Sequence, residues 1–133
     1  MIKHVLFDVD GVFTDGCFHY SAQGKIIKVF GAHDGDGIKL LRKLGLNISA
    51  ISADQRGFSI SKARMDDMDI PLELVPEVER YEYINQNHDW GSLAYMGDGI
   101  FDVQALRKAK FGIAPANATK SAKGGADYVT KKN

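Results

Sequence analysis

Two acidic residues interrupt an apolar run near the start of the chain. The run over residues 2–9 is typical of a buried strand, and Asp8 and Asp10 lie at its carboxyl end. Side chains two residues apart in an extended chain point the same way, so the two carboxylates would emerge together. Neighbouring carboxylates repel each other unless they share a proton or hold a cation. We therefore predict a Mg²⁺ site here, followed by a turn at Gly11.

The same acids could perform phosphoryl transfer. A carboxylate such as Asp8 can attack phosphorus and form an aspartyl-phosphate, which splits one difficult transfer into two easier ones. Asp10 would serve as general acid and then as general base. The Asp8 carboxylate, the Asp10 carbonyl and the distant Asp98 would suffice to hold Mg²⁺. A simple turn is the plain alternative, because Asp-Gly is a common turn signal, but the whole acidic run up to Gly16 favours function.

A second group of candidates follows the apolar run over residues 46–52. The Ser52 hydroxyl could donate a hydrogen bond to a phosphate oxygen, with Ala53 beside it, although a helix cap before Arg56 explains Ser52 equally well. Arg56, Arg64 and Arg80 are candidate phosphate or carboxylate contacts, since guanidinium binds both anions in bidentate fashion. For any single one of these arginines, solvated surface is the stronger interpretation.

The segment around Asp98 supplies two further acids. Gly97, Asp98 and Gly99 indicate a turn between a strand and a helix. Asp98 is predicted to bind metal. Asp102 could support the site by holding a Lys or a metal-bound water, or could be a first-turn acid favoured by the helix dipole.

Strand-like and helix-like runs alternate along the chain. The predicted strands are residues 2–9, 46–52, 72–75, 93–96, 111–114 and 128–130, and the predicted helices are residues 38–44, 56–68, 77–88 and 99–110, with a helical turn at 117–123. This alternation predicts an α/β fold, a three-layer doubly wound parallel sheet of Rossmann-like type. Ligands bind such sheets beyond the carboxyl ends of the strands, where the acids and Ser52 would meet.

Residues 17–30 are predicted to form a projecting β-hairpin that turns at Gly24. An isolated hairpin is marginally stable in water, and this one carries more apolar side chains than a free hairpin should show. We expect it to lie against the domain body or a neighbouring subunit.

Composition limits the class of protein. A chain of 133 residues predicts a single domain over 1–133, with no separate cap domain. Lys+Arg and Asp+Glu are equal at 17 each, so no nucleic-acid partner is expected. No apolar run suits a membrane span or signal peptide, so no membrane partner is expected either. Cys17 is the only cysteine, which rules out an internal disulfide and favours a cytoplasmic location.

The run from Asp8 to Gly16, Ser52 and the Gly97-Asp98 pair with Asp102 together resemble the haloacid dehalogenase superfamily of phosphohydrolases. The segments at 34–38 and 126–130 narrow the resemblance to its capless sugar-acid phosphatase branch. The resemblance implies Asp8 as nucleophile, Asp10 as acid and base, and Ser52 on the phosphate. It implies Mg²⁺ held by Asp8, Asp10 and Asp98. It also implies a homotetramer formed through the hairpins, in which a neighbour partly covers each site.

The sequence departs from that family at four positions in three segments. Arg80 stands where members normally carry Lys, Ser52-Ala53-Asp54 replaces Ser-Gly-Arg, and Gly99 replaces a common second Asp. The leading hypothesis is a Mg²⁺-dependent phosphomonoesterase acting on a phosphorylated, acidic keto-deoxy sugar. The alternative is a weakened or inactive member that serves as an oligomerisation or regulatory domain in sugar-acid activation. A receiver domain fits less well, because its phosphorylated Asp lies deep in the chain.

Overall fold

A computed structural model describes residues 1–133 and contains one six-stranded sheet in the order β5-β4-β1-β6-β7-β8. All neighbouring strands in it are parallel, which confirms the predicted sheet. The strands are β1 (His4–Asp8), β4 (Asn47–Ser52), β5 (Leu72–Leu74), β6 (Leu93–Met96), β7 (Phe111–Ala114) and β8 (Tyr128–Val129).

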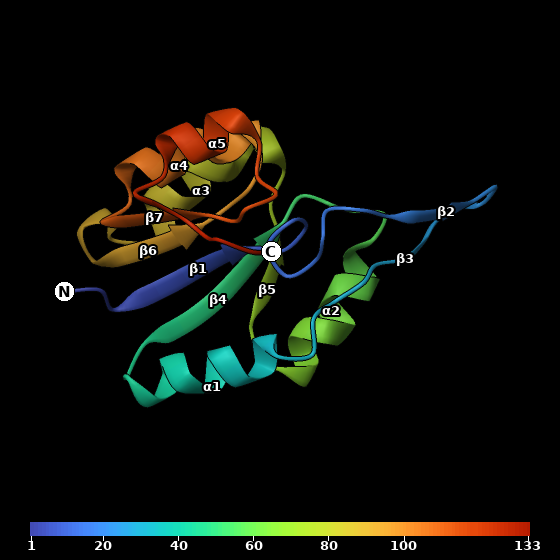
Figure 1. The fold of residues 1–133 in the computed structure, drawn as a ribbon, viewed down its shortest axis with the longest axis horizontal. Coiled ribbons are helices and arrows are strands. Elements are labelled where there is room, and N and C mark those ends of the chain that lie inside the picture. Colours follow the sequence, from blue (N-terminus) through green and yellow to red (C-terminus); the bar gives the residue numbers. More distant parts are fainter.

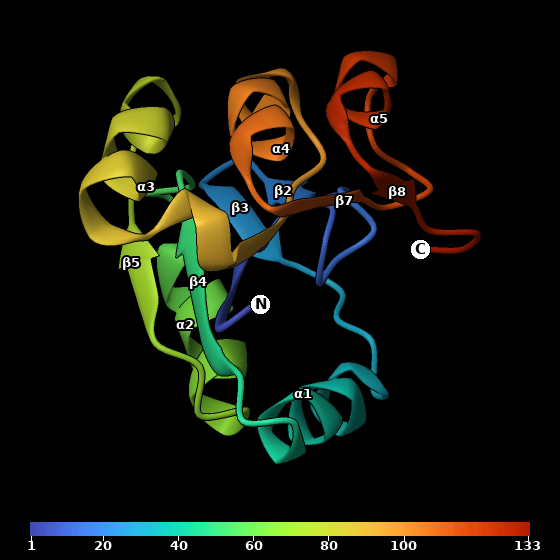
Figure 2. The same cartoon turned by 90° about the vertical axis from the view of Figure 1, so that its left-hand side faces the viewer.

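Helices cover both faces of this sheet and complete a three-layer fold (Figures 1 and 2). One face carries α1 (Asp34–Lys43) and α2 (Phe58–Asp67), and the other carries α3 (Arg80–Asn87), α4 (Val103–Lys108) and α5 (Lys120–Gly125). Short 3-10 turns at Glu77–Glu79 and Ile100–Asp102 lead into α3 and α4, and a third lies at Trp90–Ser92 before β6. The fold is thus the doubly wound α/β architecture that the alternation predicts.

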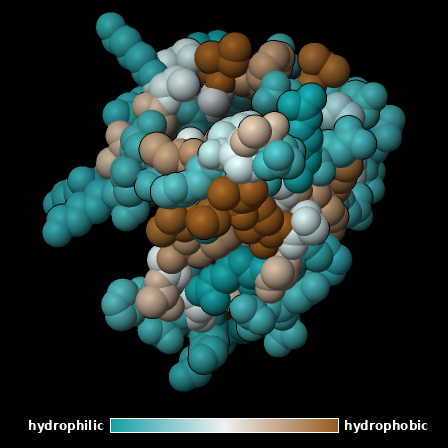
Figure 3. Space-filling model, turned by 90° about the vertical axis from the view of Figure 1, so that its right-hand side faces the viewer, coloured by the Kyte–Doolittle hydropathy of each residue, from teal (hydrophilic) through white to brown (hydrophobic).

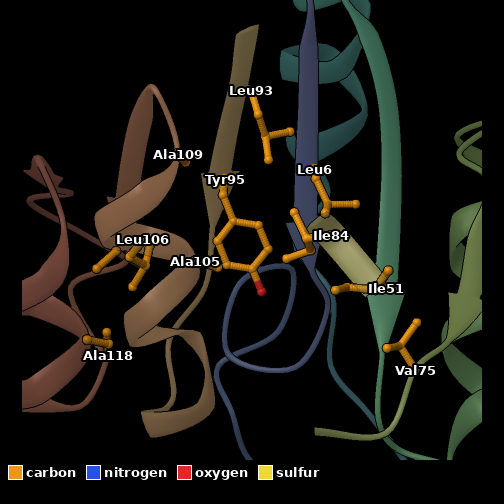
Figure 4. Packing of buried hydrophobic residues seen from close by; sticks show 12 residues of the cluster. Leu6, Ile51, Val75, Ile84, Leu93, Tyr95, Ala105, Leu106, Ala109 and Ala118 are labelled. Carbon is orange, nitrogen blue, oxygen red and sulfur yellow. The ribbon is translucent and has the colours of Figure 1, made fainter. Parts of the chain in front are cut away.

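Each face of the sheet has its own apolar core. The core under α3, α4 and α5 is built around Leu6, Tyr95 and Leu106, none of which is exposed. Figure 4 shows Tyr95 among these side chains, with its hydroxyl pointing toward the loop that follows β1. The opposite core, beneath α1 and α2, includes Val9 and Met65. Since β1 contributes to both cores, its end is held firmly from two sides.

The order of the strands places the chemically active residues together. β1 pairs with β4 on one side and with β6 on the other, so the direction of winding changes at β1. Asp8 is in register with Ile51, and Phe7 is in register with Met96. The residues that follow these strands therefore meet at one edge of the sheet, where ligands bind in folds of this type.

A separate two-stranded hairpin projects from this edge (Figure 1). It consists of β2 (His19–Ser21) and β3 (Gly24–Ile27), and a single bridge between Thr14 and Phe30 closes its base. Ile26, Ile27 and Val29 are about half exposed, and Figure 3 shows hydrophobic side chains gathered at the centre of the face on this side of the molecule. The predicted projection is confirmed, and its apolar surface is left open to solvent.

None of the helices combines the length and the apolar character needed to cross a bilayer.

Candidate active site

A cavity of about 450 Å³ opens at the carboxyl edge of the sheet. Its wall is mainly polar, and two aromatic rings, Phe18 and Phe101, lie on it. The acids that line it are Asp8, Asp10, Asp54, Glu77, Asp98 and Asp102, and the cations are Lys25 and Arg80. The six carboxylates outnumber the two cations, so a bound metal ion would balance the negative charge of the cavity.

Asp8, the last residue of β1, lies buried in the wall of this cavity. Its Oδ1 accepts a hydrogen bond of 2.9 Å from the Val9 N–H and lies 3.4 Å from Arg80 Nη2. Burial raises the pKa of Asp8 well above its ordinary value. Arg80 opposes this rise, whereas Asp102 and Asp98 add to it. The Asp8 carboxylate is therefore held in a fixed orientation. Its ionised form is unfavourable unless another cation binds nearby.

Asp98 reaches the Asp8 carboxylate from the loop after β6. This approach requires glycine at position 11, because a Cβ there would lie only 1.8 Å from Asp98 Oδ2. Gly11 also has a φ of +83°, which a side chain would make unfavourable. Burial raises the pKa of Asp98 as well; the hydrogen bond with Asp8 opposes the rise, and Asp102 adds to it. Asp8 and Asp98 therefore behave as a pair that shares a proton or a cation.

Asp102 is fully buried and positions the groups around it. Its Oδ1 accepts hydrogen bonds from Arg80 Nη1, at 2.6 Å, and from the Tyr95 hydroxyl. Its Oδ2 accepts hydrogen bonds of 2.9 Å from the backbone N–H groups of Asp98 and Gly99. Both oxygens are thus satisfied by protein donors, and Asp102 holds Arg80 and the Asp98 loop in place.

Arg80 lies at the start of α3 and is only 4% exposed. It bridges Asp8 and Asp102, so a buried cation lies beside Asp8. Burial lowers the pKa of Arg80, but Asp8, Tyr95 and Asp102 outweigh that effect and raise it, which keeps the guanidinium charged. Arg80 therefore keeps a fixed positive charge beside Asp8.

Asp10 is held from the side of the hairpin by a residue that the sequence analysis missed. Lys28, just after β3, places its Nζ 2.8 Å from Asp10 Oδ1, 2.8 Å from Asp54 Oδ2 and 2.7 Å from Ser61 Oγ. The Lys28 side chain has no exposed surface, whereas 21% of the Asp10 side chain remains exposed. Since Asp10 Oδ1 itself is buried, the other oxygen is the one that faces the cavity.

Lys25 and Asp54 extend this group toward the mouth of the cavity. Lys25 Nζ lies 2.7 Å from Asp54 Oδ2 and 3.5 Å from the centre of the Phe18 ring. Burial alone would raise the pKa of Asp54, but hydrogen bonds from Lys25, Lys28 and the Gly57 N–H lower it to about 2. Asp54 is therefore an anion at neutral pH and fixes two lysines of the hairpin region to the body of the domain.

The residues around Asp8 fit a magnesium ion. Asp8, Asp98 and Asp102 offer carboxylate oxygens within 4.8 Å of one another. Because Asp102 is already satisfied, Asp8 and Asp98 are the two carboxylates able to bind metal. The Asp10 carboxylate is engaged by Lys28, and its carbonyl oxygen accepts no backbone hydrogen bond. Two carboxylates and one carbonyl match the preference of Mg²⁺ for few protein oxygens.

The remaining predicted residues divide into two groups. Ala53 lines the cavity, and Ser52 lies buried beside it, where its Oγ accepts a hydrogen bond of 3.2 Å from the Asp54 N–H. Arg56 and Arg64 do not line the cavity. Arg56 is exposed, and Arg64 donates a hydrogen bond of 3.1 Å to the Gly31 carbonyl, because α2 directs it toward that turn. The structure thus corrects the expectation that these two arginines face the substrate cavity.

One signal in the sequence could have identified the missing lysines. Lys25 and Lys28 flank two isoleucines in an otherwise apolar strand, and Asp54 stands as an unexplained acid after β4. A buried acid needs a cation, so two lysines in a segment expected to lie against the body are natural partners.

Comparisons with known proteins give the class. The model of the haloacid dehalogenase-like hydrolases matches residues 81–133. The 3-deoxy-D-manno-octulosonate 8-phosphate phosphatase of Haemophilus influenzae is 34% identical over 96% of this chain and 73% of its own length. The chain therefore belongs to the haloacid dehalogenase superfamily, in the branch of the 3-deoxy-D-manno-octulosonate 8-phosphate phosphatases, and it is a phosphatase.

Solved structures agree with this assignment. The 3-deoxy-D-manno-octulosonate 8-phosphate phosphatase of Moraxella catarrhalis, in complex with a magnesium ion, a phosphate ion and a KDO molecule, superposes with a TM-score of 0.85 at 26% identity. The match covers 98% of this chain and 77% of that one. The cobalt-bound phosphatase of Haemophilus influenzae gives a TM-score of 0.82 at 33% identity, over 98% of this chain and 78% of that one.

Proposed function

We propose that this phosphatase is a Mg²⁺-dependent phosphomonoesterase of acidic sugar phosphates that works through an aspartyl-phosphate on Asp8. One observation carries the proposal: Asp8, Asp10 and Asp98 line the same cavity, and Arg80 lies against Asp8. The names of the relatives support a sugar acid phosphorylated at a terminal carbon, of the 3-deoxy-D-manno-octulosonate 8-phosphate type.

In the first half of the reaction, the free Asp8 oxygen attacks phosphorus while the bond from phosphorus to the sugar oxygen breaks. Oδ1 is restrained by Val9 N–H and Arg80, which leaves Oδ2 for the attack. Asp10, initially protonated, gives its proton to the departing sugar oxygen. Arg80 remains beside Asp8 and stabilises the charge that develops on the transferred group.

In the second half, water hydrolyses the aspartyl-phosphate. Asp10, now a carboxylate, removes a proton from the water as its oxygen attacks phosphorus, and the bond between phosphorus and Asp8 breaks. Asp8 returns as a carboxylate, inorganic phosphate leaves, and Asp10 carries the proton for the next cycle. Lys28 holds Asp10 Oδ1 throughout, so the same oxygen faces the reacting group in both halves.

Mg²⁺, held by Asp8, Asp98 and the Asp10 carbonyl, would neutralise phosphate charge and orient the transferred group. Its charge would also relieve the repulsion that raises the pKa values of Asp8 and Asp98.

The alternative of an inactive domain is less well supported. A degenerate member would be expected to lose part of the acidic set or the cation beside the nucleophile. Here Arg80 is buried, charged and bridged to both Asp8 and Asp102. The change from Lys to Arg therefore does not remove the positive charge.

Phosphate release tests the proposed function. The full chain should release phosphate from 3-deoxy-D-manno-octulosonate 8-phosphate with Mg²⁺ and lose activity with EDTA. Asp8→Asn and Asp10→Asn should each reduce the rate, the latter by about 10²- to 10⁴-fold. Lys39→Met, an exposed change on α1, is the matched control. No turnover of any sugar phosphate in a panel would refute the proposal.

We also propose that the protein is a cytoplasmic homotetramer whose hairpins pack together. Ile26, Ile27 and Val29 give the hairpin an apolar surface that no part of the same chain covers. Replacing Ile27 and Val29 with Glu should release monomers in analytical ultracentrifugation, whereas Leu40→Glu on α1 should not. An unchanged mass for the hairpin variant would reject this interface.

A further inference from the structure

We propose that Lys25 determines specificity by binding a carboxylate on the leaving-group part of the substrate. This inference rests on the proposed phosphatase function and assigns a role to a residue that the catalytic steps do not use.

The position of Lys25 follows from a chain of three contacts. Asp10 Oδ1 lies 2.8 Å from Lys28 Nζ, which lies 2.8 Å from Asp54 Oδ2, and Lys25 Nζ lies 2.7 Å from that same oxygen. Lys25 therefore belongs to the same side of the cavity as Asp10, where the hairpin forms part of the wall.

That side faces the leaving group. In an in-line transfer the nucleophile and the leaving oxygen lie on opposite sides of phosphorus. Asp8 attacks, and Asp10 must reach the leaving oxygen to protonate it. A cation on the Asp10 side of the cavity is consequently placed toward the sugar rather than toward the nucleophile.

Lys25 is also the cavity-lining cation that pairs with neither Asp8 nor Asp102. Of the two cations that line the cavity, Arg80 is occupied by Asp8 and Asp102. Six acids share the wall, so an anionic sugar would be repelled without a cation of its own. An ammonium has three donors, and Asp54 accepts only one from Lys25.

Neighbouring side chains fix the Lys25 ammonium in the position where it would bind the substrate carboxylate. Its side chain is 7% exposed, Asp54 anchors the ammonium, and the Phe18 ring supports it at 3.5 Å. Gly57 lets the lysines pack closely, because a Cβ there would lie 2.9 Å from Lys25 Cδ and 2.7 Å from Lys28 Cε. A fixed ammonium loses little conformational freedom when it binds a ligand, which favours selectivity.

A matched pair of substrates tests the assignment. The first is 3-deoxy-D-manno-octulosonate 8-phosphate, and the second is the same compound with its carboxylate reduced to an alcohol. Lys25→Met should lower the ratio of kcat/KM for the acid to kcat/KM for the alcohol by roughly 10- to 100-fold, the value of a charge-assisted hydrogen bond. Lys25→Arg should restore most of the ratio, and Lys39→Met should not alter it.

The outcomes separate the two proposals. If the wild type hydrolyses neither compound, the proposed function fails. If it hydrolyses both and Lys25→Met lowers both equally, the function stands and Lys25 merely anchors the hairpin. Should the variant not fold, inhibition of p-nitrophenyl phosphate hydrolysis in the wild type decides: the free sugar acid should inhibit more strongly than its reduced alcohol, and equal inhibition would overturn the assignment.

Discussion

The two halves of the active site are held by different parts of the molecule. Asp8, Arg80, Asp98 and Asp102 lie at the sheet edge, where Arg80 and Tyr95 both donate to Asp102 and Tyr95 is anchored in the core under α3, α4 and α5. Asp10 is held by Lys28, which enters from the base of a projecting hairpin. The proposed nucleophile, Asp8, is therefore held by the sheet, whereas the proposed acid and base, Asp10, depends on how the hairpin docks.

Removing Lys28, the cation on the hairpin side, should have the largest effect on the free energy of unfolding. Lys28→Met leaves Asp10 and Asp54 facing each other without their shared ammonium, which should cost about 3–5 kcal/mol of stability. Urea unfolding measures it. Lys62→Met, which breaks an exposed pair with Asp66, should cost less than about 1 kcal/mol. Equal effects of the two variants would show that the hairpin contact does not matter.

Arg80, the cation on the sheet side, should tolerate replacement by Lys but not by Met, as measured by kcat. Arg80→Met removes a charged donor beside Asp8 and should lower kcat by about 10²- to 10³-fold. Arg80→Lys keeps the charge and should preserve or raise activity, because the family resemblance implies Lys at this position. Steady-state kinetics with a sugar phosphate measure both. If Arg80→Met keeps full activity, Arg80 has no role in transfer.

Acid titration should reveal the anion that anchors the hairpin. The pKa of Asp54 falls from 3.8 to about 2 on folding, so its contribution to stability is present above pH 4 and is lost as pH falls toward 2. Asp54→Asn should cost about 2 kcal/mol at neutral pH and much less near pH 2. Unfolding free energies across this range test it, and a cost independent of pH would contradict it.

The smallest expected change concerns Asp8 without metal. Its raised pKa means that the folded state binds the proton more tightly than the unfolded state, so stability falls as pH rises above the ordinary Asp range. Asp8→Asn should therefore raise the melting temperature of the metal-free protein at pH 7 but not at pH 4. Added Mg²⁺ should stabilise the wild type more than the variant. A destabilised variant at pH 7 would oppose this account.

The sheet side of the site was predicted from the sequence, whereas the hairpin was predicted without the contacts that its lysines make. Asp8 and Asp98 follow apolar runs that mark strands, and parallel strands bring their carboxyl ends to one edge. The cation that pairs with Asp10 is Lys28, which lies 18 residues further along the chain, just after β3 of the hairpin. No local sequence pattern determines how the hairpin packs against the sheet. Arg64 does not face the cavity because α2 directs it toward Gly31, and Arg56 lies exposed in the turn before α2; no local pattern determines either position.

In the proposed reaction, Asp8 receives the phosphoryl group and Asp10 helps to remove it. Asp10→Asn protein mixed with Mg²⁺ and acetyl phosphate, whose leaving group needs little protonation, should be quenched in acid and digested. The account predicts that mass spectrometry finds one added phosphoryl group on the peptide containing Asp8, and none when Asp8→Asn is combined with Asp10→Asn. Phosphorylation that survives loss of Asp8 would contradict it.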